Sequence, residues 1–178
     1  MATLRPARCY RWNSPAYTRV SRVSALSYIA GIPGNKIVHF IFGKPENYDY
    51  EISIVYRDKI QIGHNAMEAA RVAAHAFLEK KIKGNFSMLI RTYPHHVMRE
   101  NVMATGAGAD RVQEGMRKSF GKPVGRAARV QKGQKYMSIF VNKENLELGK
   151  DATRRACMKL PGEKRIVVEE NPYKKKEN

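Results

Sequence analysis

The segment 106–130 constrains the fold most, because it is long, basic and interrupted by glycine. It reads GAGADRVQEGMRKSFGKPVGRAARV and holds six Arg or Lys against two acids, together with five glycines and one proline. Its first half has too few apolar residues to supply much of a core. Glycine lets a backbone approach a partner closely, and Arg and Lys reach out to phosphate groups. The segment therefore predicts a surface that binds a polyanion rather than a catalytic cleft.

The whole chain carries the same excess of positive charge. Its 178 residues include 33 Lys+Arg and 16 Asp+Glu, a formal net charge of +17, and 43% are hydrophobic, enough for one folded domain. Such a surplus repels itself in free solution and is neutralised on a polyanion. We expect a nucleic acid rather than a membrane. No apolar run approaches the roughly 18 residues of a bilayer span, and no amphipathic helix with an aromatic face is evident.

Residues 1–35 have the composition of an extended basic arm. No acid precedes Glu46, and two prolines oppose a regular helix in the first 15 residues. Aromatic residues are scarce in disordered segments and stack on bases, which favours an RNA-binding arm over a merely disordered basic tail. The residues of the arm that we expect to contact RNA are Arg5, Arg8, Tyr10, Arg11, Arg19 and Arg22.

Hydrophobic periodicity predicts the strands of the remaining chain. Apolar, β-branched runs indicate strands at 36–42, 85–93, 125–130, 134–141 and 164–170. Residues 49–61 alternate with period two, which predicts one strand, or two with a turn at Asp58. In that alternation Ile52, Ile54 and Tyr56 share one face.

Two helices are expected between these strands. The first follows Asn65, a plausible N-cap with Glu68 three residues later, and ends at Gly84. The second covers 145–160 and is stopped by a Pro-Gly pair. Strict βαβ alternation is absent, so the predicted fold class is α+β, with two helices packed on a mostly antiparallel or mixed sheet. This core domain spans 36–170 and is followed by a polar tail at 171–178.

No pattern in the chain indicates a cofactor or a metal. Gly106 and Gly108 lack the third glycine of a dinucleotide fingerprint, and neither a phosphate loop nor a nucleophile elbow occurs. Cys9 and Cys157 are far apart, and neither has metal-ligand spacing with any of the five histidines. We therefore expect no cofactor, no metal and no catalytic residue.

The pair His95-His96 is the most enzyme-like feature. Adjacent side chains in an extended segment point to opposite sides. Three interpretations are open: an RNA contact by stacking or phosphate binding, a buried packing histidine, and the base of an RNA-directed enzyme. No acid lies close in sequence to orient either ring, which counts against the enzyme. A general cationic nucleic-acid binder is a further alternative.

Basic residues are concentrated between 91 and 135, where ten Arg or Lys face three acids. This asymmetry predicts one strongly positive face rather than an evenly mixed surface. The residues of this region that we expect to bind RNA are Arg91, His95, His96, Arg99, Arg117, Lys118, Lys122, Arg126, Arg129, Lys132 and Lys135.

Several short motifs resemble one family of ribosomal proteins. They include RPARCY at 5–10, PHHVMR at 94–99, GADR at 108–111, GMR at 115–117 and FGKP at 120–123. Their combination resembles the large-subunit ribosomal protein family called "L ten e" in archaea and eukaryotes, the counterpart of bacterial "L sixteen". The resemblance extends from residue 5 to about 168.

The resemblance implies an α/β sandwich of the hammerhead type and a structural, non-catalytic protein of the cytoplasmic large ribosomal subunit. Members of the family bind large-subunit rRNA near the aminoacyl-tRNA site, join late in assembly and help to position tRNA. Carried over by motif, the mobile loop that faces tRNA and the peptidyl transferase centre is 102–113, with Gly106, Gly108, Asp110 and Arg111. The implied partners are large-subunit rRNA, transiently the tRNA acceptor region, and neighbouring ribosomal proteins; neither a membrane nor a homo-oligomer is expected.

Overall fold

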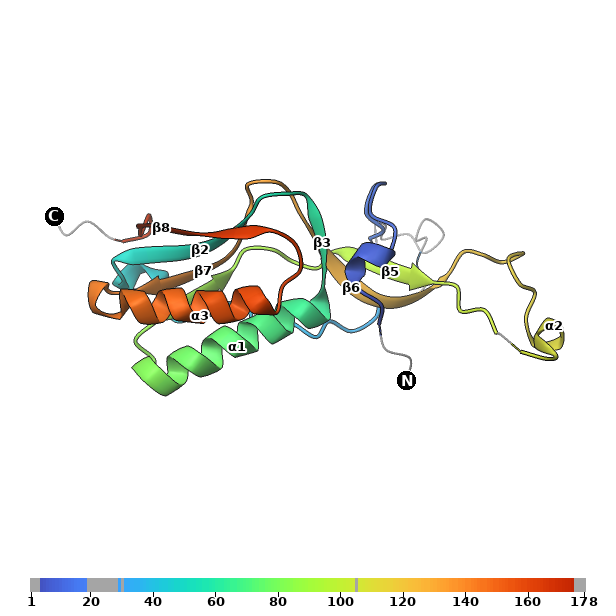
Figure 1. The fold of residues 1–178 in the computed structure, drawn as a ribbon, viewed down its shortest axis with the longest axis horizontal. Coiled ribbons are helices and arrows are strands. Elements are labelled where there is room, and N and C mark those ends of the chain that lie inside the picture. Colours follow the sequence, from blue (N-terminus) through green and yellow to red (C-terminus); the bar gives the residue numbers. More distant parts are fainter. Residues whose placement is uncertain (1–3, 19–28, 30, 105, 175–178) are drawn as a thin grey trace.

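The chain folds into an elongated α+β structure with two antiparallel sheets (Figure 1). The computed structural model describes residues 4–18, 29, 31–104 and 106–174. The strands are β1 (Ile41–Phe42), β2 (Tyr50–Tyr56), β3 (Ile60–Gly63), β4 (Ser87–Ile90), β5 (His96–Glu100), β6 (Lys122–Val130), β7 (Lys135–Val141) and β8 (Lys164–Glu170). The larger sheet has the order β1-β4-β7-β2-β8 and the smaller β3-β6-β5. The predicted fold class is confirmed, with two sheets in place of one.

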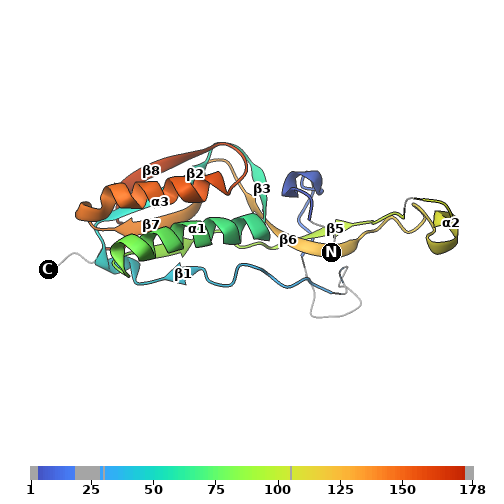
Figure 2. The same ribbon diagram turned by 60° about the horizontal axis from the view of Figure 1, so that its bottom comes forward.

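Two long helices, α1 (His64–Ile82) and α3 (Leu146–Met158), lie side by side on one face of the larger sheet (Figures 1 and 2). The core lies between them and the sheet, and Ile52, Ile54 and Tyr56 face it as predicted. Close packing explains why α3 contains Gly149. A Cβ at this position would lie 2.5 Å from Ile52 Cδ1.

The boundaries of several elements differ from the prediction. Of the run 36–42, only Ile41–Phe42 forms a strand. Ile37 is nevertheless buried, because its side chain belongs to the core cluster although its backbone is not part of a strand. The N-cap of α1 is Gly63 rather than Asn65, and Gly63 has no side chain that could cap the helix. Glu68 binds Arg71 instead of closing a capping box. The alternating segment 49–61 forms two strands, which belong to different sheets.

The first residues of the predicted polar tail pack beside the larger sheet. Asn171 is buried, and its Nδ2 donates to the carbonyl oxygens of Pro45, at 2.5 Å, and Tyr48, at 2.7 Å. Lys174 Nζ lies 2.7 Å from Asp49 Oδ1. The tail is therefore held to the fold as far as Lys174, and residues 175–178 lie outside the described range.

The smaller sheet carries the described part of the arm and a projecting loop. A 3₁₀ turn at Ala7–Cys9 packs on this sheet, where Tyr10, Met98 and Ala127 form a second apolar cluster. Residues 101–121 leave β5, form the short helix α2 (Ala109–Val112) and return to β6 (Figure 1). This loop extends away from α1 and α3, at the far end of the molecule. Among the described residues, no helix is both long and apolar enough to cross a bilayer.

Candidate nucleic-acid interface

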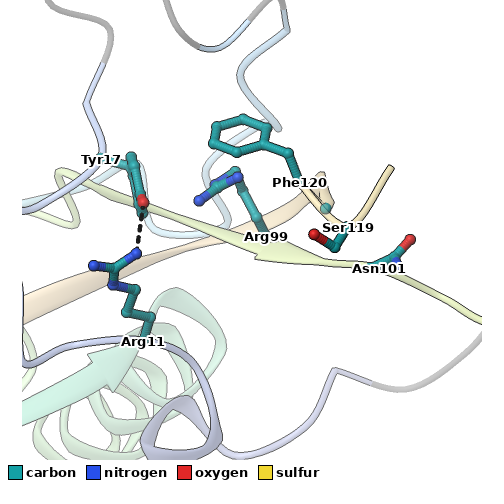
Figure 3. A pocket seen from close by; sticks show the side chains of 7 residues that line it. Arg11, Tyr17, Arg99, Asn101, Ser119 and Phe120 are labelled. Carbon is teal, nitrogen blue, oxygen red and sulfur yellow. Dashed lines mark hydrogen bonds between the residues drawn. The ribbon is translucent and has the colours of Figure 1, made fainter. Parts of the chain in front are cut away.

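A basic and aromatic pocket lies where the projecting loop leaves the smaller sheet (Figure 3). Its volume is about 320 Å³. Arg11 and Tyr17 come from the arm and Arg99 from β5, and the base of the loop supplies the remaining side chains. The residues that line it are Arg11, Tyr17, Arg99, Asn101, Ser119, Phe120 and Gly121. We call it the loop-base pocket.

Arg99 lies between two aromatic rings in this pocket. Its guanidinium carbon is 3.4 Å from the centre of the Phe120 ring and 4.0 Å from that of Tyr17. The two rings are nearly perpendicular, at 86°, and cation–π attraction holds the guanidinium group beside both of them. Arg99 Nε is buried and has no hydrogen-bond partner in the described chain, while Phe120 is 59% exposed. Arg11 Nη1 donates to the Tyr17 hydroxyl at 3.1 Å (Figure 3).

Two further arginines on β6 hold the arm in place. Arg129 Nη2 donates to the Arg11 carbonyl oxygen at 3.2 Å, and Arg129 Nη1 donates to the carbonyl oxygen of Ser14. Arg126 Nε donates to the Pro33 carbonyl oxygen at 2.9 Å. Both guanidinium groups were predicted as RNA contacts. Arg129 instead positions the backbone that carries Arg11, and Arg126 holds the arm at Pro33.

The two adjacent histidines have different environments. His96 is 2% exposed, and its Nδ1 accepts a hydrogen bond of 3.0 Å from the Tyr17 backbone N–H. Burial and the nearby charge of Arg129 lower the pKa of His96 to about 4. His96 is therefore a neutral residue that packs in the interior, and it is poorly suited to act as a catalytic base near neutral pH. His95 is exposed, with its ring centre 4.7 Å from that of Tyr93.

Arg91 and Lys135 lie away from the pocket and bind acids of the larger sheet. Glu51 is fully buried, and its carboxylate accepts hydrogen bonds from Arg91 Nη2 at 2.8 Å and Lys135 Nζ at 3.2 Å. Ser138 Oγ donates to the same carboxylate at 2.5 Å, and Lys135 also reaches Glu169 at 2.6 Å. These two cations, predicted as RNA contacts, are therefore largely neutralised within the protein.

The remaining predicted contacts are mostly exposed. Tyr10 is the exception, since its ring is buried and its hydroxyl donates to Glu100 at 3.0 Å. Lys132 lies in the turn between β6 and β7. The N–H of the next residue, Gly133, donates to the Tyr56 carbonyl oxygen at the end of β2. Lys132 is therefore not part of the projecting loop. The predicted contacts that are exposed are Arg5, Arg8, Arg11, His95, Arg117, Lys118, Lys122 and Lys132. Arg19 and Arg22 lie outside the described residues.

The glycines of the projecting loop adopt backbone conformations that other residues avoid. Gly106 has φ of 140° and Gly108 of 80°, and α2 follows with Asp110 and the exposed Arg111. Gln113 closes this tip with its carboxamide. Its Nε2 donates to the Val102 carbonyl oxygen at 2.5 Å, and its Oε1 accepts from the Ala104 N–H.

Three residues of this region were not predicted from the sequence. Tyr17 and Phe120 enclose Arg99, and Gln113 ties the two sides of the loop. An aromatic residue isolated in a basic, glycine-rich run was an available signal for Phe120, because exposed aromatic rings stack on bases. In the described ranges, no three His, Cys, Asp or Glu side chains are grouped as metal ligands would be.

Comparison with known proteins agrees with the motifs. Residues 13–167 match the family model described as Ribosomal protein L16p/L10e. The chain is 49% identical over 170 residues to the large ribosomal subunit protein uL16 of Sulfolobus acidocaldarius, covering 93% of each chain. It is 50% identical over 167 residues to uL16 of Staphylothermus marinus, covering 92% of each. With uL16 of Methanococcus aeolicus the identity is 47% over 168 residues, 93% of this chain and 94% of that one. The chain therefore belongs to the ribosomal protein L16p/L10e family.

Proposed function

We propose that this protein is a structural component of the large ribosomal subunit and binds large-subunit rRNA near the aminoacyl-tRNA site. The interface consists of the arm, the loop-base pocket and the exposed cations of the projecting loop. In this role the protein supports tRNA positioning and late subunit assembly. It supplies position and positive charge, and no side chain reacts.

The arrangement around Arg99 is the observation that carries this proposal. An exposed ring at Phe120, two guanidinium groups and the amide of Asn101 meet in one pocket of about 320 Å³. Proteins bind unpaired RNA with aromatic platforms flanked by cations, because every base has a face that stacks and every nucleotide has a phosphate. The names of the relatives, large ribosomal subunit protein uL16, support RNA of that subunit as the partner.

Binding to a large-subunit rRNA fragment at increasing salt tests the interface. Each phosphate contact contributes roughly 0.7–0.9 to the negative slope of log affinity against log salt. We expect a steep slope that Arg11→Ala and Arg117→Ala each reduce by about one contact. The control is Lys80→Ala, which removes an exposed cation of α1, outside the proposed interface. A flat salt response, or equal losses in all three variants, would overturn the interface.

A second measurement tests the proposed role of the loop at tRNA. Arg111 is exposed on α2, at the tip of the projecting loop. In subunits reconstituted with Arg111→Ala, we expect weaker aminoacyl-tRNA binding with unchanged incorporation of the protein. Normal tRNA binding in such subunits would show that the tip does not serve tRNA.

The same RNA-binding measurement separates this function from a general cationic binder. We expect the rRNA fragment to be retained when an excess of unrelated duplex DNA is added, because a pocket that stacks an unpaired base has no equivalent ligand in a duplex. Complete displacement by the duplex would favour the general binder.

A further inference from the structure

A second cavity lies where the arm meets the start of α1 and the end of α3, and it shares no residue with the loop-base pocket. Its volume is about 410 Å³, within the roughly 300–1,000 Å³ of small-molecule sites. The residues that matter for its chemistry are Arg5, His64, Asn65, Met98, Met158 and Lys159. We call it the helix-start cavity.

The polar end of this cavity suits an anion. The first turn of α1 borders it, and the N-cap of that helix, Gly63, has no side chain that could cap the turn. The first N–H groups of a helix lack partners within it and carry partial positive charge. Lys159 lines the cavity and is exposed. Arg5 is exposed as well, and its Nε lies 3.4 Å from Glu100 Oε1. None of the residues lining the cavity is acidic.

His64 adds a buried donor that lacks an acceptor. Its ring is 4% exposed, and its Nδ1 accepts a hydrogen bond of 3.1 Å from the Lys36 N–H, which places the proton on Nε2. Burial, with the charges of Lys36 and Arg126, lowers the pKa of His64, so the ring is neutral. Nε2 has no hydrogen-bond partner in the described part of the chain. Leaving such a buried donor unpaired is unfavourable, and a ligand that brings an acceptor removes this cost.

Two details define how a ligand reaches this donor. A Cβ at Gly125 would lie 3.4 Å from His64 Nε2 and 3.3 Å from Leu4 Cδ1, so the Leu4 side chain lies close to the donor and a ligand would have to displace it. Asn65 Oδ1 is also buried without a partner; rotation of its carboxamide by a half-turn offers an NH₂ donor instead. Both polar groups lie on residues that line the cavity.

The other walls are apolar and adaptable. Met98, Leu160 and Pro161 line the cavity, and Met158 beside them is 82% exposed. Methionine is flexible and polarisable and packs well against flat rings. The cavity thus combines apolar walls, a hydrogen-bond donor and a cationic end.

We propose that the helix-start cavity binds one unpaired nucleotide of RNA, with the base between the methionine and proline walls and the phosphate at the start of α1 beside Lys159. The inference rests on the proposed function, since the bound RNA supplies the nucleotide. An apolar side chain of a neighbouring protein would fill the walls but leave Lys159, the first turn of α1 and His64 without partners. The polar groups therefore favour a nucleotide.

Methyl-labelled methionine in the full-length chain provides the test, with adenosine 5′-monophosphate, adenosine and inorganic phosphate as separate probes. We expect the monophosphate to shift the NMR signals of Met98 and Met158, and adenosine to do so more weakly. Ala66→Leu, which fills the cavity, should weaken monophosphate binding at least about tenfold. Lys159→Ala should weaken binding of the monophosphate about threefold to tenfold and leave adenosine unchanged. Lys80→Ala is the matched control.

Three results would overturn the inference. The first is that the monophosphate does not shift the signals of Met98 and Met158. The second is that inorganic phosphate alone shifts them equally. The third is that an apolar probe such as N-acetyltyrosine amide shifts them and the nucleotide does not. The last would assign the cavity to a protein partner. Lys159→Ala lies at the exposed end of α3, so it tests the phosphate contact even if Ala66→Leu disturbs folding. If the protein binds rRNA with a steep salt slope but does not bind the monophosphate, only this inference is wrong. If it binds the monophosphate but its rRNA binding does not depend on salt, the proposed function is wrong.

Discussion

Arg91 Nη2 lies 2.8 Å from Oε1 of Glu51, whose side chain is fully buried on the face of the larger sheet that α1 and α3 do not cover. Lys135 and Ser138 complete the hydrogen bonds of the carboxylate. A buried charge is tolerated only when its partners are present, so this group couples β2, β7 and the residue that follows β4 through side chains.

Removal of Arg91 should therefore destabilise the fold. We expect Arg91→Met to lower the free energy of unfolding by about 3 kcal/mol, because Glu51 stays buried and loses one of its two cationic partners. Arg57→Met is the control. Arg57 pairs with Glu163 at 3.7 Å on the surface, where such pairs contribute about 0–1 kcal/mol. Urea unfolding measures both; equal effects would show that the buried pair has no special role.

Glu51 should also shape the acid limit of stability. Burial raises the pKa of Glu51, but the hydrogen bonds from Ser138, Arg91 and Lys135 outweigh it and hold the pKa below the ordinary value. The unfolded chain then binds this proton more readily, so the stabilisation is present above about pH 4.3 and is lost as pH falls through the folded-state pKa. Glu51→Gln should show a flatter loss of stability below pH 4.3. If the free energy of unfolding falls equally steeply below pH 4.3 in the wild type and the variant, this prediction is wrong.

His96 should lose its neutral form only in acid. Its pKa of about 4 lies below the ordinary histidine value of about 6.5, so the unfolded state binds more protons between these values. His96 therefore contributes stability above pH 6.5 that disappears as pH falls to 4. The ring signals of His96 in NMR should titrate with a midpoint near 4, and a midpoint near 6.5 would show that the ring is not desolvated.

Periodicity predicted the parts of the fold that depend on local pattern. The face shared by Ile52, Ile54 and Tyr56 is the core face, and Lys164–Glu170 is a strand as expected. Period two, however, cannot distinguish a solvent face from a face that other segments cover. Glu51 occupies the second face of β2 and was not expected to be buried.

The candidate site was predicted less well, because charge in a sequence does not specify its partner. The basic region contains Arg91, Arg126 and Arg129. Each of them donates a hydrogen bond to an acceptor at least 40 residues away in the sequence, which only the tertiary structure brings near. The pairing of Arg99 with Phe120 likewise depends on β5 meeting β6 across the loop. Composition predicted a polyanion-binding surface, and only tertiary structure separates its structural cations from its exposed ones.

Phe120 and Arg11 should affect RNA binding in different ways. Stacking of a base contributes about 1–3 kcal/mol and is not ionic, so Phe120→Ala should weaken rRNA binding by roughly tenfold without changing its salt slope. Arg11→Ala should reduce the slope. Val38→Ala is the control, because Val38 is 72% exposed and lies in the segment before β1 of the larger sheet, not in the loop-base pocket. A reduced slope in Phe120→Ala would show that its effect is the displacement of cations and not lost stacking.

Gly121 should tolerate no side chain at the base of the loop. A Cβ there would lie 2.5 Å from the Glu100 carbonyl carbon and 2.7 Å from the Asn101 nitrogen, and backbone atoms cannot rotate away. We expect Gly121→Ala to lower the free energy of unfolding by about 1–3 kcal/mol and to weaken rRNA binding, because Phe120 is displaced with its neighbour. Gly34→Ala is the matched control, since a Cβ at Gly34 meets nothing within 4 Å. If both variants unfold alike in urea and bind rRNA alike, the close approach of β5 to the loop does not position Phe120.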